Sequence, residues 1–134
     1  SDYISELIKE AGMEDRIHLV GQTRYIKSWL ENFDIFLLTS IVEGLPNVLI
    51  EAQAFGVPVI TTNAGGANDT ILDGESGFVV KGDSEIISDK LYSCISNTKW
   101  MVEAGKIARS NSREKFSTEK MLTNLIQIYD RSIR

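Results

Sequence analysis

Two carboxylates, Glu43 and Glu51, stand eight positions apart in a segment that is otherwise mostly apolar. Positions 40–61 read S-I-V-E-G-L-P-N-V-L-I-E-A-Q-A-F-G-V-P-V-I-T, and between positions 48 and 60 only Glu51 and Gln53 carry polar side chains. We therefore predict that Glu51 lies on a substantially buried helix. Because a buried charge is costly unless a partner compensates it, this carboxylate requires either a bound ligand or a cation of the same domain.

The residues around the two carboxylates predict a strand, a loop and a helix. The apolar run at positions 34–39 indicates a buried parallel strand, and positions 40–45 form the loop at its carboxyl end. Pro46 suits the first position of a helix that continues over positions 47–55, since a missing N–H costs nothing there. Gly56 and Pro58 then end the helix, and positions 57–61 predict the next strand.

This arrangement places both carboxylates at the edge of the sheet where ligands usually bind. Ligands of open α/β sheets lie outside the carboxyl ends of the strands, where helix N-termini present free N–H groups. Glu43 is on the loop after the strand, while Asn47 and Glu51 are four residues apart and share one helical face. The sequence therefore predicts a binding site at this edge.

Further sequence blocks follow in a fixed order. After E-G-L-P-N-V-L-I-E-A come G-V-P-V-I-T, the pair Gly65 and Gly66, and D-G-E-S-G-F-V-V at positions 73–80, which predicts a turn followed by a strand at positions 78–80. Upstream, positions 15–21 read D-R-I-H-L-V-G and precede a segment with Trp29. The series resembles the Glu-x7-Glu signature of retaining glycosyltransferases with the GT-B architecture, especially the family 4 group that uses nucleotide-sugar donors. The resemblance covers roughly residues 1–115 and includes a strand at 15–21 followed by a short helix.

The resemblance implies a role for each residue of the motif. In this family the second glutamate, here Glu51, holds the ribose hydroxyls of the donor, because a carboxylate accepts well from two vicinal hydroxyls. The first, here Glu43, lies near the donor sugar and is the expected catalytic residue, and positions 21–24 lie near the nucleobase. The donor-binding residues that it implies are Glu43, Gly44, Leu45, Pro46, Asn47, Val48 and Glu51. The donor would be a UDP- or GDP-linked sugar, and we expect no bound metal or other cofactor.

The length of 134 residues predicts a single domain. The resemblance implies an α/β fold with a Rossmann-like parallel sheet flanked by helices, the C-terminal, donor-binding half of a GT-B enzyme. The family's first two strands and its phosphate-binding Arg and Lys have no counterpart before position 21, so we expect residues 1–134 to be a partial domain cut from a longer protein. Four strands would remain, and the N-terminal acceptor domain would be missing.

The C-terminal region predicts helices over about 83–133. Asp83 or Ser84 would cap a helix over positions 84–96, a second would span 100–115, and Ser117 would cap the last.

Some single residues have simple structural interpretations. We interpret His18 as a packed core histidine, Trp29 and Phe33 as core anchors, Cys94 as an apolar filler, and Gly65 with Gly66 as a turn.

Composition and charge limit the function classes. The chain is 43% hydrophobic. It has one cysteine, which excludes an internal disulfide. It has no apolar stretch of membrane-spanning length. The net charge of −5 argues against nucleic-acid binding. We expect a cytoplasmic protein. The basic C-terminal third could also bring the full enzyme to acidic lipids at the inner face of the membrane, although a solvated helix surface explains those charges more simply.

Two alternatives from other functional classes remain open at this point. One is a catalytically inert α/β interaction module that keeps the motif as structure and binds no nucleotide. The other is a sugar-nucleotide epimerase of the GT-B architecture, which would not transfer sugar to an acceptor. The block E-G-L-P-N-V-L-I-E favours the transferase, which would move a sugar to a glycan or lipid-linked acceptor with retention.

Overall fold

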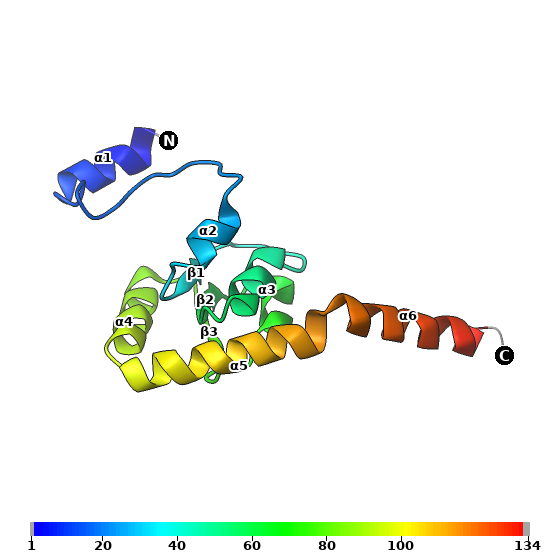
Figure 1. Cartoon of the computed structure of the whole chain (residues 1–134). Helices are drawn as coiled ribbons and strands as arrows, with labels where there is room; N and C mark the ends of the chain where they lie inside the picture. Colours follow the sequence, from blue (N-terminus) through cyan, green and yellow to red (C-terminus); the bar gives the residue numbers. More distant parts are fainter. Residues whose placement is uncertain (1, 133–134) are drawn as a thin grey trace.

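A parallel three-stranded sheet forms the centre of the molecule (Figure 1). The computed structural model describes residues 2–132. The strands β1 (Phe36–Leu38), β2 (Val59–Thr62) and β3 (Gly77–Val80) lie in the order β1-β2-β3. The register places Phe36 beside Val59 and Val59 beside Gly77. The sheet confirms the predicted parallel α/β class, and each strand falls within or close to its predicted range.

Six α-helices and one 3₁₀ helix accompany the sheet within residues 2–132. They are α1 (Asp2–Glu10), α2 (Ile26–Leu30), α3 (Asn47–Ala54), η1 (Gly65–Thr70), α4 (Ser84–Ile95), α5 (Thr98–Phe116) and α6 (Thr118–Ser132). Figure 1 shows α3 and α4 on either side of the strands, with α5 running along the body and α6 continuing beyond it. Residue 1 and residues 133–134, which end the predicted domain and helical region, lie outside the described part of the chain.

Helices pack on both faces of the sheet, as predicted. On one face Val59 joins a buried apolar cluster with Leu49 and Ala52 of α3. On the other face Ile60 packs with Cys94 of α4 in a second cluster. Because β2 is covered on both sides, all its residues are buried. Cys94 is the apolar filler that we predicted, and burial raises the pKa of its thiol, a shift that Ser93 and Lys90 partly oppose.

The predicted strand at positions 15–21 does not form. Residues 17–21 have no regular secondary structure, and their side chains are exposed. In the expected sheet order this strand pairs with one of the two strands that the sequence lacks. Its backbone N–H and C=O groups therefore have no neighbouring strand with which to form hydrogen bonds. The short helix predicted after it is confirmed as α2.

Three expected core residues of the N-terminal third are also exposed. His18 lies on the unpaired segment, and Trp29 and Phe33 are 40% and 39% accessible to solvent. The rings of Trp29, Phe33 and Phe36 follow one another at centroid distances of 6.1 and 6.3 Å. The core interpretation was wrong for these residues because no described element covers this side of α2 and β1.

The caps of the C-terminal helices follow the sequence closely. The Asp83 carboxylate accepts from the amides of Glu85 and Ile86 at the start of α4, at 3.0 and 3.1 Å. The Ser117 hydroxyl accepts from the amide of Lys120 at the start of α6, at 3.2 Å. The helix predicted over positions 100–115 begins two residues earlier, as α5. Among residues 2–132 no helix is long and apolar enough to cross a membrane.

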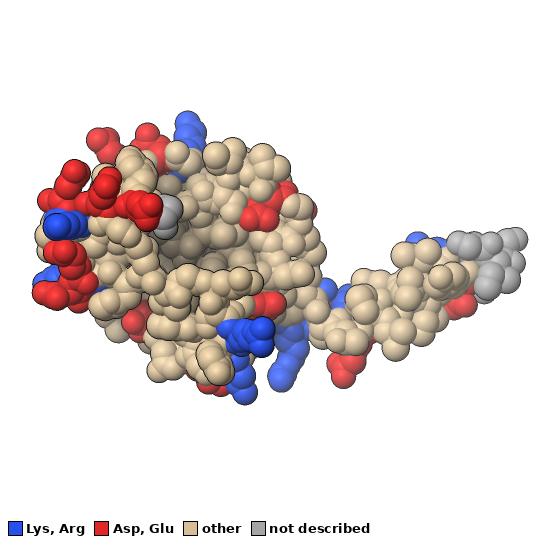
Figure 2. All heavy atoms as spheres, turned by 90° about the horizontal axis from the view of Figure 1, so that it is seen from above, with Lys and Arg blue, Asp and Glu red and all other residues tan. Residues whose placement is uncertain are grey.

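The charges are unevenly spread over the molecule. Figure 2 shows acidic side chains gathered at the end where α1 lies, whereas α6 extends away from the opposite end with few charges in view. The apolar side chains of α6 are exposed. They are Met121, Leu122, Leu125, Ile126, Ile128 and Tyr129. These side chains form a broad apolar stripe that α6 does not bury against the body.

Candidate functional site

Glu43 is held at the carboxyl end of β1 by two hydrogen bonds in series. The Ser40 hydroxyl donates to Oε1 of Glu43 at 2.6 Å, and the Thr62 hydroxyl donates to the carbonyl of Ser40. Thr62 is the last residue of β2 and is buried, while Glu43 is half-buried. The buried centre of the sheet therefore determines the position of this carboxylate through Ser40.

The two glycines at the start of η1 pack against the loop that carries Glu43. A Cβ on Gly65 would overlap the carbonyl oxygen of Glu43, and one on Gly66 would overlap that of Gly44. Gly65 also has a φ of +60°, a conformation that L side chains rarely adopt. We predicted a simple turn at this pair. The glycines instead begin a 3₁₀ helix and let two backbone segments approach closely.

The start of α3 faces this loop without a side-chain cap. Pro46 is the N-cap residue with ψ of 96°, rather than the first helical residue as predicted, and no side chain caps the first turn. Asn47 begins the helix, with its side chain exposed. The first amides of an uncapped helix remain available to an acceptor, and the helix dipole favours a negative charge there.

Glu51 is exposed, contrary to the prediction of a buried acid. The buried residues of α3 are Leu49, Ala52 and Gln53, which are spaced three and four apart and so share one face. Glu51 lies on the other side of the helix. The prediction was wrong because it rested on the number of apolar neighbours and not on which residues share the buried face of the helix. The polar residue that lies on the buried face is Gln53.

Gln53 is the centre of a buried hydrogen-bond network. Its Nε2 donates to the carbonyl of Thr70 at 2.8 Å, and its Oε1 accepts from the Ser76 hydroxyl at 3.1 Å. The side-chain amide of Asn111 on α5 donates to Gln53 Oε1 and to the Thr70 carbonyl at 3.2 and 3.0 Å. The network joins α3, η1, the turn before β3 and α5, so Gln53 serves the fold rather than a ligand.

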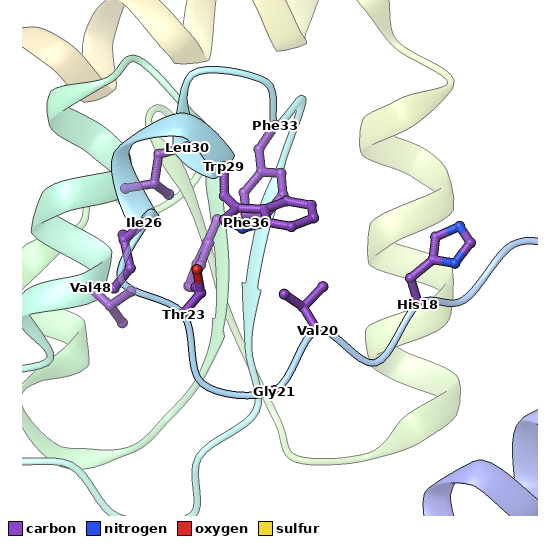
Figure 3. A pocket seen from close by; sticks show the side chains of 10 residues that line it. All are labelled: His18, Val20, Gly21, Thr23, Ile26, Trp29, Leu30, Phe33, Phe36 and Val48. Carbon is purple, nitrogen blue, oxygen red and sulfur yellow. The ribbon is translucent and has the colours of Figure 1, made fainter.

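A first cavity of about 400 Å³ lies between α2, β1 and the unpaired segment before α2 (Figure 3). Gly21 and Thr23, from the segment predicted near the nucleobase, line it together with Val48 of α3. The aromatic rings of Trp29, Phe33 and Phe36 form its apolar wall. Figure 3 shows the His18 side chain pointing away from the other lining residues.

A second cavity of about 720 Å³ contains other predicted donor-binding residues. Leu45, Asn47 and Glu51 line it opposite residues of α5 and α6, among them Lys115 and Leu125. Within the described residues Glu51 makes no ion pair, so the alternative of a structural salt bridge is not supported. The structure thus brings Leu45, Asn47 and Glu51 together but places Val48 in the first cavity.

The third cavity was not predicted from the sequence. It has a volume of about 420 Å³ and lies at the carboxyl ends of all three strands. Polar residues that directly end or follow a strand line it: Thr39, Ser40, Thr62, Asn63 and Lys81. The signal was present as polar residues after each strand, but only the strand order brings them together.

Comparison with known proteins identifies the family. The model of the family "Glycosyl transferases group 1" matches residues 1–114. The chain belongs to the group 1 glycosyl transferases. This confirms the resemblance to GT-B glycosyltransferases of the family 4 type.

Relatives and solved structures of glycosyltransferases agree with this assignment. The chain is 39% identical over 104 residues to the capsular polysaccharide biosynthesis glycosyltransferase CapM of Staphylococcus aureus, covering 77% of this chain and 27% of that protein. The crystal structure of a glycosyltransferase from Rickettsia africae matches with a TM-score of 0.90 at 29% identity, over 99% of this chain and 36% of the other. HepE from Anabaena, solved in complex with UDP, matches with a TM-score of 0.86 at 25% identity, over 97% and 37%.

This glycosyltransferase chain spans only part of its relatives. It covers between 21% and 38% of the length of eight curated relatives. Within residues 2–132 no group of three or more His, Cys, Asp or Glu side chains could hold a metal ion. The predicted site residues therefore have to act through the Glu43 loop, the start of α3 and Glu51, without a metal held by such a group.

Proposed function

We propose that residues 1–134 are the donor-nucleotide-binding half of a retaining, family 4-like glycosyltransferase. The complete enzyme transfers a sugar from a UDP- or GDP-linked donor to a glycan or lipid-linked acceptor. One observation supports this most directly: in a chain of this family, Glu43 is fixed beside the uncapped start of α3. The likeness to a solved UDP complex supports a nucleotide-linked donor.

Each residue of the motif has a role in this proposal. Glu51, exposed and free of ion pairs in the described chain, accepts hydrogen bonds from the two ribose hydroxyls. The amides at the start of α3, with the backbone of positions 44–48, meet the pyrophosphate, where the helix dipole and free N–H groups favour an anion. Glu43 accepts from hydroxyls of the donor sugar and orients its anomeric carbon.

Glu43 also has an electrostatic role in the reaction. During transfer the bond between the anomeric carbon and the phosphate oxygen breaks, a bond to the acceptor oxygen forms on the same face, and the acceptor hydroxyl proton passes to the leaving phosphate. Positive charge develops on the sugar and negative charge on the leaving phosphate. A fixed carboxylate near the sugar and amides near the phosphate stabilise these charges without reorganising, since both are positioned before the donor binds.

Other parts of a longer enzyme complete the site. An N-terminal domain provides the other side of the acceptor site, and the first two strands of the family add the cations that grip the pyrophosphate. These parts also cover the exposed rings of Trp29 and Phe33. We place the complete enzyme in the cytoplasm. The basic residues of the C-terminal helices offer a contact with acidic lipids at the inner face of the membrane.

A nucleotide titration followed by NMR tests the proposal. We expect UDP or GDP, but not both equally, to shift amides at positions 44–51, and Glu51→Ala to lose this binding. Glu75→Ala, which removes an exposed acid outside the cavities described above, should bind as the unmodified chain does. Equal nucleotide affinity in both variants would overturn the ribose role, and a complete enzyme, with the first two strands present, that binds no nucleotide would contradict the donor-binding assignment.

The catalytic assignment requires the complete enzyme. Glu43→Ala should lower kcat while leaving the affinity for UDP or GDP nearly unchanged, because the nucleotide is held by other residues. Steady-state kinetics with the sugar donor, together with nucleotide binding, measure the two effects separately. A variant that keeps its kcat would remove Glu43 from the catalytic machinery.

A further inference from the structure

The third cavity lies outside the donor residues but touches the support of Glu43. Ser40 lines this cavity and donates to the Glu43 carboxylate at 2.6 Å. The cavity volume of about 420 Å³ falls in the range of small-molecule sites, roughly 300–1,000 Å³. It also lies at the carboxyl ends of the strands, the edge where open α/β sheets bind ligands. A molecule in this cavity would therefore lie close to the proposed catalytic side chain.

Two lining residues, Ser40 and Thr62, offer hydrogen-bond acceptors. The hydroxyl proton of Ser40 is used by Glu43, and that of Thr62 is used by the Ser40 carbonyl. A hydroxyl has one proton to donate and two lone pairs to accept with. Both oxygens therefore remain available only as acceptors, and they suit a ligand that brings O–H groups of its own.

Two other lining residues, Asn63 and Lys81, offer donors and the positive charge. The side-chain oxygen of Asn63 accepts from Asn68 at 2.8 Å, so the Asn63 amide presents its two N–H donors. Lys81 makes no ion pair among residues 2–132. The nearest acid in sequence, Asp83, uses its carboxylate to cap α4 through the amides of Glu85 and Ile86. The side chains of Asn63 and Lys81 therefore suit an anionic oxygen acceptor.

We propose that this cavity binds an acidic sugar unit of the acceptor glycan. The sugar hydroxyls donate to Ser40 and Thr62, and the carboxylate of the sugar accepts from Asn63 and Lys81. A singly charged carboxylate matches the one cationic side chain in the lining. The assignment to the acceptor rests on the proposed function, in which the donor contacts Glu43, positions 44–48 and Glu51, none of which lines this cavity.

Titration of the chain with two matched sugars tests this site. Methyl α-D-glucuronide and methyl α-D-glucoside differ only in a carboxylate that replaces a hydroxymethyl group. We expect the glucuronide to bind with roughly millimolar affinity and to shift amides at positions 39–41, 62–63 and 81–82. Lys81→Gln should weaken this binding about tenfold, as for the loss of a charge-assisted hydrogen bond. Lys99→Gln, which removes an exposed lysine outside the cavity lining, should have no effect.

Several outcomes would overturn the site. Equal affinity for the two sugars, or unchanged glucuronide binding in Lys81→Gln, would show that the cavity does not select an acidic sugar. The same shifts with sodium acetate at equal concentration would reduce it to a general anion contact.

UDP titration of the same samples separates this inference from the proposed function. Lys81→Gln should bind UDP as the unmodified chain does. If UDP binds and the glucuronide does not, the acidic-sugar site fails while the donor-binding function stands. If the glucuronide binds and no nucleotide does, in the complete enzyme as well, the donor-binding function fails while the sugar site stands.

Discussion

Glu51 and Gln53 lie two residues apart on α3 and have opposite environments. Gln53 is fully buried, and its side-chain amide is hydrogen-bonded to partners on three other parts of the chain. Glu51 is exposed and lines a cavity, with no ion pair in the described chain. On one helix, the polar group that is already satisfied stabilises the fold, and the group that lacks a partner is available to a ligand. Four substitutions test this division between residues that stabilise the fold and residues that serve the site. They follow in order of their expected effect on the free energy of unfolding, from the largest to the smallest.

Gln53→Ala should lower the free energy of unfolding the most, by about 3 kcal/mol, because the buried Ser76 hydroxyl and one of the two hydrogen bonds of the Asn111 amide lose their acceptor. Urea unfolding followed by circular dichroism measures the change. Gln22→Ala, at an exposed position, is the matched control. If both variants lose the same stability, the network is not the stabilising element that the geometry indicates.

Gly66→Ala should lower the free energy of unfolding by about 2 kcal/mol, since the new methyl group overlaps the carbonyl of Gly44. The loop that carries Glu43 must then move. Gly82→Ala is the control, because its Cβ meets only a methyl group of Thr62 at 3.7 Å, an ordinary contact distance. Equal unfolding midpoints for the two variants would show that the close approach at Gly66 is unimportant.

Ser40→Ala should cost about 1 kcal/mol of stability, the value of a hydrogen bond at a half-buried site. Its larger effect should be on turnover in the complete enzyme, where kcat falls and the KM for the donor changes little, because Glu43 loses its support. Ser40→Thr keeps the hydroxyl and should restore kcat. A threonine variant as slow as the alanine variant would argue against a positioning role.

Glu51→Ala should change the free energy of unfolding by less than about 0.5 kcal/mol, as expected for an exposed side chain with no partner in residues 2–132. Thermal unfolding measures this, and the nucleotide titration described above uses the same variant. A marked loss of stability would mean that Glu51 belongs with Gln53 to the structural side of α3.

Local signals predicted much of this fold. The strands near positions 36, 59 and 77, the helix α3 and the cap residues Asp83 and Ser117 all follow from neighbouring residues in the sequence. Such features depend on periodicity and on side-chain hydrogen bonds within a few residues. They can therefore be predicted before any tertiary structure is known.

Features that depend on distant contacts were predicted less well. The strand at positions 15–21 needs a neighbouring strand that the sequence does not provide, and His18 is exposed with it. The burial of Glu51 was misjudged because hydrophobic content was counted without helical phase. The third cavity combines residues that follow three different strands, so Lys81 could be found only from the strand order.

The loop that carries Glu43 and the 3₁₀ helix η1 that packs against it differ strongly in their tolerance to substitution. Ile41 and Val42 are 92% and 82% exposed, whereas Gly65 and Gly66 leave no room for a side chain. A saturation library over positions 41 and 42 should therefore yield mostly folded variants, and one over positions 65 and 66 should retain almost only glycine. Directed evolution of sugar specificity in this enzyme family could vary the first pair freely and should leave the second pair unchanged.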